Sequence, residues 1–346
     1  MGAYGRLFVR TADLRRIPRI RSITLAFLLL LSHAVPNASV GQASQPRYRI
    51  GVLTDAFETT PFLRIPGVGR ILEPLGYTEG KNIAIERRFA RSSNDQLPEL
   101  AAGLVASRVD LIAAIGMGAT RAARKATRTI PIVMLVEDDP VAAGLVKALA
   151  EPGGNVTGIV KRTAQLNVKR LQLLSEVVPG LERVGVFWNP GNPEKAAEWK
   201  TLQTSAQALG LELELLALGA DTELEPVFDA GIKAGCGALL VTIDRAAHQN
   251  ARTIGELAIA HRLPTIFPSA EYVNLAIGLM SYGPSGLDLS IQFGTYIDKV
   301  LKGASPSTLP IEQPQRFELY LSNIVARAIG VQFPPSLLLR ADQVRE

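Results

Sequence analysis

Residues 49–53, with the sequence RIGVL, decide the fold, because a closely similar stretch, RVGVF, returns at residues 183–187. Each stretch is a short apolar run with two β-branched residues, the pattern of a buried strand. In both halves of the chain, 25 residues separate the glycine of the stretch from the glycine of a Leu-Gly pair, at Gly76 and at Gly210. The shared order and spacing predict two similar α/β lobes.

Further apolar runs predict the other strands of the first lobe, at residues 83–86, 111–115, 132–135 and 156–160. Between them, residues 97–105 carry apolar side chains at the i, i+3, i+4, i+7 spacing of a helix, with Pro98 suited to its first turn. Ile-Pro-Ile at 130–132 and Leu-Pro-Thr at 263–265 open a matching strand in each half. Strands that alternate with helices predict parallel sheets with helices on both faces.

The first 43 residues are predicted to be an export signal. A basic stretch ends at Arg21 and is followed by a short apolar run, residues 23–31, which is too short to span a bilayer. Small residues then offer cleavage sites at Ala38 and Ala43, and the alternative is an anchor that is not cleaved. The mature protein is therefore expected in the periplasm, without a lipid anchor because no lipobox cysteine lies directly after the apolar run.

Charge and cysteine content argue against nucleic-acid binding and exclude an intrachain disulfide. The chain has 37 basic and 32 acidic residues, of which six basic and one acidic lie in residues 1–43, so that 31 of each remain. A formally neutral mature chain has no overall field that would draw it to nucleic acid. Cys236 is the only cysteine, so no intrachain disulfide is possible. No nucleic-acid partner, cofactor or metal is expected, and the protein is expected to be a monomer.

The sequence contains no recognisable catalytic set, so we do not expect an enzyme. No H-E-x-x-H, Walker A or G-x-S-x-G pattern occurs. The two histidines beyond the export segment, His248 and His261, are expected on solvated helix surfaces. Residues 116–121, GMGATR, begin like a dinucleotide fingerprint but lack its third glycine and follow the third strand instead of the first.

Ligand-binding residues are expected where the strands end, because open α/β sheets bind ligands at the carboxyl ends of their strands. Gly116 and Gly118 lie between a strand and a helix, where free amides and the helix dipole can receive a carboxylate; a tight turn that merely needs glycine is the alternative. The candidate residues are Asp55, Phe57, Glu58, Gly116, Met117, Gly118, Ala119, Asp139, Trp188, Asn189 and Asp244.

Three of these candidates have an equally good structural interpretation. Trp188 could belong to the core instead of facing a ligand. Asp139 could cap a helix that begins at Val141, and Asp244 could cap a helix instead of holding a ligand ammonium group.

Four stretches together resemble the ABC transporter substrate-binding family that includes bacterial tryptophan- and tyrosine-type receptors. They are LGYTEGKNI at 75–83, AEPGGNVTG at 150–158, GLMSYGP at 278–284, and a tail that joins LPIEQP at 309–314 to PPSLLLRAD at 334–342. The resemblance covers the chain from about residue 47 onward. This sequence departs from it at Met117-Gly118, where many relatives have a Thr-Pro-like pair.

The resemblance implies a type I periplasmic-binding fold, in which two Rossmann-like lobes with parallel sheets are joined by three crossovers. By analogy the crossovers lie at 160–163, 267–269 and 303–307, which assigns residues 44–160 and 270–303 to lobe 1, and 161–269 and 304–346 to lobe 2. The implied function is a receptor that closes on a small organic ligand, an amino acid or related carboxylate, and delivers it to the membrane permease of an ABC importer.

Three other functions share this fold or this composition. An exported Rossmann-like enzyme would need a base or nucleophile that the sequence does not show. A sugar-repressor-type regulator would need an N-terminal helix-turn-helix, whereas residues 1–43 carry an apolar export segment. A ligand-sensing accessory of a membrane sensor is not separated from a transport receptor by sequence.

Overall fold

The computed structural model describes residues 47–54, 67–90, 94–190, 195–219, 222–243, 245–275 and 277–346. The predicted export segment lies outside these ranges, as do four candidate binding residues: Asp55, Phe57, Glu58 and Asp244. Within the described ranges no helix has the length and apolar character needed to cross a membrane.

The first sheet has five strands in the order β2-β1-β3-β4-β5, and every neighbouring pair is parallel. The strands are β1 (Tyr48–Thr54), β2 (Ile83–Phe89), β3 (Leu111–Ile115), β4 (Ile132–Val136) and β5 (Val156–Val160). All five coincide with predicted strands. β3, β4 and β5 are buried along their whole length, as expected for parallel strands covered on both faces.

The second sheet has seven strands in the order β12-β11-β10-β9-β8-β6-β7. The strands are β6 (Arg183–Trp188), β7 (Glu212–Ala217), β8 (Ala238–Val241), β9 (Thr265–Phe267), β10 (Met280–Pro284), β11 (Phe317–Ser322) and β12 (Gln343–Arg345). Only the pairing of β10 with β11 is antiparallel among these described strands.

The two sheets repeat one topology, which confirms the predicted two-lobed α/β fold. The first five strands of each half occupy the same spatial order, β2-β1-β3-β4-β5 and β7-β6-β8-β9-β10. Gly76 and Gly210 precede the second strand of each half and have φ angles of 88° and 70°. Glycine adopts this left-handed conformation without the Cβ clash that penalises other residues, which explains its return at the same spacing.

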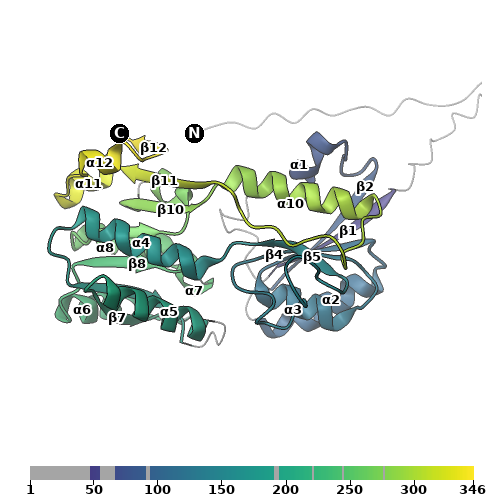
Figure 1. Cartoon of the computed structure of the whole chain (residues 1–346), viewed down its shortest axis with the longest axis horizontal. Helices are drawn as coiled ribbons and strands as arrows, with labels where there is room; N and C mark the ends of the chain where they lie inside the picture. Colours follow the sequence, from purple (N-terminus) through teal and green to yellow (C-terminus); the bar gives the residue numbers. More distant parts are fainter. Residues whose placement is uncertain are drawn as a thin grey trace, which may run out of the picture. The chain divides into compact units, whose positions relative to one another are not determined.

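Helices cover both faces of each sheet (Figure 1). In the first lobe one face of the sheet packs against α1 (Val68–Leu72) and α10 (Gly286–Leu301). The other face packs against α2 (Leu97–Ala106) and α3 (Met117–Ala126). In the second lobe one face carries α4 (Thr163–Val177), α5 (Lys195–Ala208), α11 (Asn323–Ile329) and α12 (Pro335–Leu338). The opposite face carries α6 (Leu224–Lys233), α7 (Arg245–Gln249), α8 (Ala251–Ala260) and α9 (Ala270–Asn274). Short 3₁₀ turns at Glu73–Leu75 and Asn94–Gln96 complete the set.

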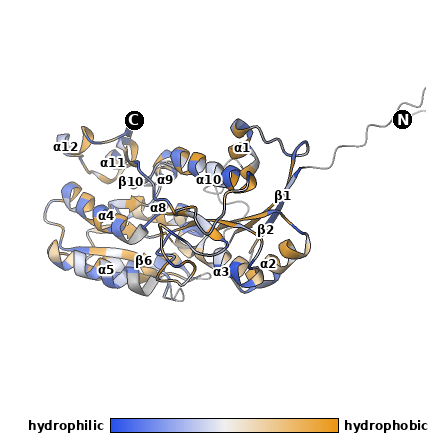
Figure 2. Cartoon of the chain, turned by 45° about the vertical axis from the view of Figure 1, so that its right-hand side comes forward, coloured by the Kyte–Doolittle hydropathy of each residue, from blue (hydrophilic) through white to orange (hydrophobic). Residues whose placement is uncertain are grey.

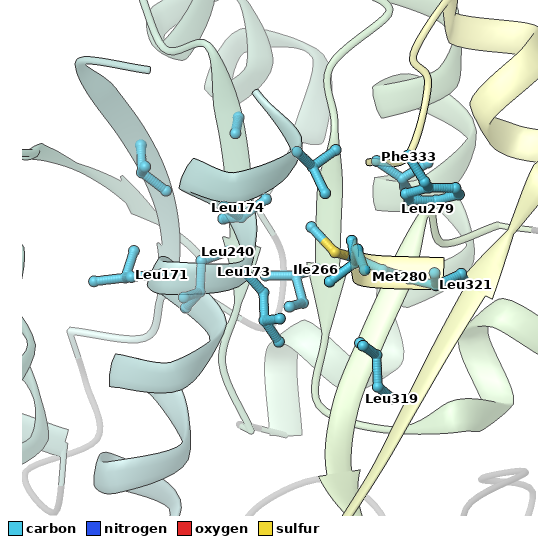
Figure 3. Close-up of a cluster of buried hydrophobic side chains, with 14 of the residues drawn as sticks. Leu171, Leu173, Leu174, Leu240, Ile266, Leu279, Met280, Leu319, Leu321 and Phe333 are labelled. Atoms are coloured by element: carbon cyan, nitrogen blue, oxygen red, sulfur yellow. The ribbon is translucent and has the colours of Figure 1, made fainter. Parts of the chain in front are cut away.

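The amphipathic pattern of the helices matches this layering. Figure 2 shows α4, α5 and α10 with hydrophilic and hydrophobic stripes. The apolar stripe of α4 packs on the second sheet, where Leu171 and Leu174 meet Leu240, Ile266 and Met280 (Figure 3). Burial of such side chains stabilises the fold by about 1.5–3 kcal/mol each.

Each lobe receives one helix from the chain that leaves the other lobe. β5 belongs to the first sheet, yet α4, which follows it, packs on β8, β9 and β10. β10 belongs to the second sheet, yet α10, which follows it, packs on β3, β4 and β5. Both crossovers therefore follow the fifth strand of the repeat.

This exchange corrects one predicted boundary. Residues 270–284 were expected in lobe 1, but β10 pairs with β9 and β11 in the second sheet. The second crossover therefore follows Pro284 and does not lie at 267–269. The prediction ended this part of lobe 2 one strand too early. The short segment 280–284 contains a glycine and a proline, residues that are typical of a turn and uncommon in a buried fifth strand.

The third crossover also lies later than predicted. Residues 304–312 were assigned to lobe 2, but the amide of Ile311 donates to the carbonyl of Leu149, and the amide of Gly153 donates to the carbonyl of Ser307. The hydroxyl of Tyr296 donates 2.6 Å to the carbonyl of Pro310. This stretch is therefore fastened to the first lobe, and the chain crosses between Glu312 and the start of β11 at Phe317.

Candidate ligand-binding site

The turn after β3 is built on Gly116, the residue that precedes α3. Its φ of 100° is open to glycine and strained for other residues. The amide of Gly116 donates 2.9 Å to the carbonyl of Leu135 on the neighbouring strand. The carbonyl of Gly116 accepts the amide of Thr120 at 3.1 Å and its hydroxyl at 2.8 Å. These bonds fix where α3 begins relative to the sheet edge.

The first turn of α3 has the properties of an anion site. The amides of Met117, Gly118 and Ala119 precede the first intrahelical bond, so helix geometry gives them no carbonyl partner within α3. The first turn holds no acidic residue, and no side chain caps the helix. The positive end of the helix dipole points in the same direction. The Met117 side chain is only 4% exposed and packs into the core. It therefore does not cover the backbone amides of this turn.

Asp139 follows β4, the strand next to β3, and is partly engaged in a turn. Its Oδ1 accepts the amides of Val141 at 2.8 Å and Ala142 at 3.3 Å. The helix expected to begin at Val141 is absent, and residues 140–144 form a turn instead. A contact between the exposed Asp139 carboxylate and a ligand stays a prediction.

A buried ion pair that was not among the candidate residues lies at the same edge of the sheet. Lys161 Nζ is 3.2 Å from Glu137 Oε1, and the lysine is only 7% exposed. The two residues directly follow β5 and β4, which are paired neighbours. The signal available in the sequence is their equivalent position, one residue after each of two fully buried strands. A charge in that position must be paired when the sheet edge is covered.

His248 differs from the expectation of a solvated histidine. The ring nitrogen Nδ1 is hydrogen-bonded to the hydroxyl of Tyr272, whose ring stacks on Phe267 at 4.7 Å between centroids. Burial, with a smaller contribution from the Lys161 charge, lowers the pKa of His248 to about 4. The imidazole is therefore neutral at physiological pH. His261 is exposed, as expected, and stacks on Phe228.

In the second lobe Trp188 and Asn189 lie at the carboxyl end of β6. Trp188 is 7% exposed and packs against Trp199, with 5.4 Å between the ring centroids. Its ring is therefore largely part of the core, in agreement with the structural interpretation of this residue. Asn189 is half-buried. The next strand end carries Thr242, whose hydroxyl donates 2.8 Å to the carbonyl of Phe187 and ties the ends of β6 and β8 together.

A fully buried arginine, Arg170, hydrogen-bonds to the backbone just after β9 and in the middle of β10. Arg170 on α4 donates from Nε to the carbonyl of Tyr282 at 2.8 Å and from Nη2 to that of Pro268 at 3.5 Å. Its Nη1 donates to the side-chain oxygen of Asn167, and the amide group of Asn167 donates in turn to Glu198. Burial lowers the pKa of Arg170 to about 10, while the Glu198 charge opposes that effect, so the guanidinium stays charged.

The remaining described features do not add to this site. A cavity of about 490 Å³, lined partly by Val178, Pro264 and Pro334, lies at the amino-terminal ends of β8 and β9. Among the residues with described positions, no group of three His, Cys, Asp or Glu side chains could hold a metal ion. The thiol of Cys236 is buried, and burial raises its pKa to about 11.

Known proteins share this architecture. A tyrosine-binding protein from Clostridioides difficile is 27% identical over 270 residues, which cover 77% of this chain and 76% of that protein. A conserved domain protein from Vibrio cholerae superposes with a TM-score of 0.79 at 24% identity and covers 86% of this chain and 100% of its own. An ABC domain from Streptococcus pneumonia in complex with L-Trp superposes with a TM-score of 0.77 at 25% identity and covers 86% and 99%.

These structures have the two-lobed type I periplasmic-binding fold, and the chain described here shares it. The family model described as ABC transporter substrate binding protein matches residues 61–345, which include both sheets except β1. The chain therefore belongs to the ABC transporter substrate-binding protein family.

Proposed function

We propose that this protein is the extracytoplasmic receptor of an ABC importer and that its two lobes close on an amino acid or a related carboxylate. Family membership supports the role of a substrate-binding protein. The duplicated topology supports the mechanism, because each lobe has its own core and can move as a rigid body. A closed receptor presents its permease with a surface that the open form lacks.

The first turn of α3 carries the proposal of a carboxylate ligand. Amides of Met117, Gly118 and Ala119 at a helix N-terminus favour a negative group. Two relatives agree with this class of ligand, since one is named a tyrosine-binding protein and another was crystallised with L-Trp. In the second lobe, Asn189 and Asp244 are proposed to contact the opposite end of the ligand, with Trp188 presenting only its exposed edge.

We further propose that residues 1–43 are removed on export to the periplasm and that the mature protein acts as a monomer without turnover of its ligand. N-terminal sequencing of periplasmic material tests the first point, and a mature form that begins at Met1 would contradict it. Prolonged incubation with ligand, followed by mass spectrometry, tests the second. Several turnovers in a highly purified sample would favour the exported enzyme.

Calorimetric titration with L-tyrosine and L-tryptophan tests the ligand class. A Gly118→Val variant should lose affinity at least tenfold, because a β-branched side chain would cover the amides that receive the carboxylate. Gly103→Val is the matched control, since it adds the same side chain to another helix of the first lobe, at a site with no atom within 4 Å of the new Cβ. Equal affinity in wild type and a folded Gly118→Val protein would exclude this turn as the site.

A further inference from the structure

Arg162 stands out among the described residues because its backbone is left-handed at the start of a helix. Three non-glycine residues in the described part of the chain have positive φ: Arg108, Arg162 and Arg262. Arg108 and Arg262 each follow the end of a helix, and their amides donate to the carbonyls of Val105 and Ile259. A left-handed residue is a common way to end a helix. Arg162 instead precedes α4, with φ 55° and ψ 54°, where extended backbone is usual.

The internal repeat shows that the topology does not require this conformation. Ser285 occupies the corresponding place before α10, the other exchanged helix. Its φ of −56° and ψ of 117° are unstrained, and its side chain accepts the amide of Asp288 as an ordinary cap. No side chain caps α4. Thus the first crossover contains backbone strain that the equivalent second crossover avoids.

Arg162 is also a single link between two fixed segments. The amide of Lys161 donates 2.9 Å to the carbonyl of Val136, so the residue before it is still bonded to the first sheet. The amide of Gln165 donates 3.3 Å to the carbonyl of Arg162, so the residues after it already belong to the first turn of α4. Any rotation of one lobe relative to the other must therefore change the backbone angles at or next to Arg162.

The side chain of Arg162 joins this link to the third crossover. Its Nη1 donates 3.3 Å to Oε1 of Gln313. The amide of Val160 donates 3.0 Å to the carbonyl of Glu312 in the same stretch. The described left-handed backbone and the bond between Arg162 and Gln313 therefore belong to one arrangement of the hinge.

We propose that Arg162 is a two-state pivot: its backbone is left-handed in the arrangement seen here and leaves that region when the lobes change their relative orientation. The strain of the left-handed state offsets part of the stability of this arrangement and keeps the second one accessible. The inference rests on the proposed lobe closure and names the residue that controls it.

The test measures the distance between the lobes in the absence of ligand, so it does not depend on the identity of the ligand. Spin labels are attached at Lys125→Cys on α3 and Lys233→Cys on α6, both exposed positions. The buried native Cys236 should label slowly. Electron–electron resonance then gives the distance distribution for wild type, Arg162→Gly and Arg162→Val. Glycine relieves the left-handed strain and valine increases it, so the two variants push the equilibrium in opposite directions.

The ratio of the two populations should differ at least about tenfold between Arg162→Gly and Arg162→Val. Arg108→Gly with Arg108→Val, and the same pair at Arg262, are the matched controls, since they change left-handed strain inside one lobe. They should alter thermal stability but not the interlobe distances. Identical distributions for both Arg162 variants, or equal shifts in the controls, would overturn the pivot. Failure of the proposed function would instead appear as absence of ligand binding with the pivot intact.

Discussion

The amide of Ser285 donates a hydrogen bond of 3.0 Å to the carbonyl of Arg316. This bond joins the second crossover to the third, just beyond the point where Pro284 pairs with Phe317 in the β10–β11 ladder. The amide of Val160 bonds in turn to Glu312, so the first crossover lies against the third as well. The three connections form one hydrogen-bonded strip and would have to twist together when the lobes move.

The packing of the exchanged helix α10 predicts opposite effects of two glycine substitutions. A Cβ on Gly294 would lie 2.4 Å from Ile71 Cγ2, because α1 and α10 approach closely there. Gly294→Ala should therefore lower the free energy of unfolding by about 1–3 kcal/mol. Gly103→Ala in α2 meets no atom within 4 Å and should raise it by about 0.5–1 kcal/mol. Urea denaturation measures both, and destabilisation of equal size by both would contradict this account of the contact.

The buried Arg170 cluster predicts a large cost for removing its charge. In Arg170→Met the carbonyls of Tyr282 and Pro268 lose a donor, and Glu198, 3% exposed, loses the buried cation of its cluster. The free energy of unfolding should fall by about 3–5 kcal/mol. Arg340→Met removes the partly exposed pair with Glu176 and should cost about 1 kcal/mol or less. Similar losses in the two variants would show that the buried cluster contributes little.

The neutral His248 predicts a specific dependence of stability on pH. Its pKa is about 4 in the folded protein, below the ordinary value of 6.5, so the unfolded chain binds more protons between these limits. Its contribution to stability is therefore complete above about pH 6.5 and is lost as the pH falls toward 4. The loss between pH 7 and pH 4.5 should be about 2–3 kcal/mol.

His248→Gln removes this titration and keeps a polar partner for Tyr272, so its unfolding free energy should depend less on pH than that of wild type. His261→Gln, at an exposed position, is the control and should follow wild type. Urea denaturation at the two pH values provides the comparison. A wild-type profile in His248→Gln would mean that the histidine titrates normally.

The sequence predicted the fold well because its signals are local. Fully apolar runs such as 132–136 become buried parallel strands, and the two Leu-Gly pairs mark turns that need left-handed backbone. The crossovers could not be placed in the same way. Whether residues 280–284 pair with one sheet or the other depends on contacts between distant segments, and no periodicity in the chain encodes that choice.

The candidate site was only partly accessible to sequence analysis for a related physical reason. Gly116 and the following amides could be found, because a strand, a glycine and a helix are adjacent in the chain. Lys161 and Glu137 are 24 residues apart and meet only because β4 and β5 are neighbours. His248 was assigned to a solvated surface, since the sequence does not show that Tyr272 covers it.

Small-angle X-ray scattering of the purified mature protein, with and without a saturating amino acid identified by thermal shift, tests the central claim most directly. Each lobe should keep its own core while the lobes rotate about the strip of crossovers. The radius of gyration should then fall by about 1 Å on binding, a typical scale for hinge closure of domains of this size. An unchanged scattering profile at saturating ligand would show that the lobes do not close and would contradict the proposed receptor mechanism.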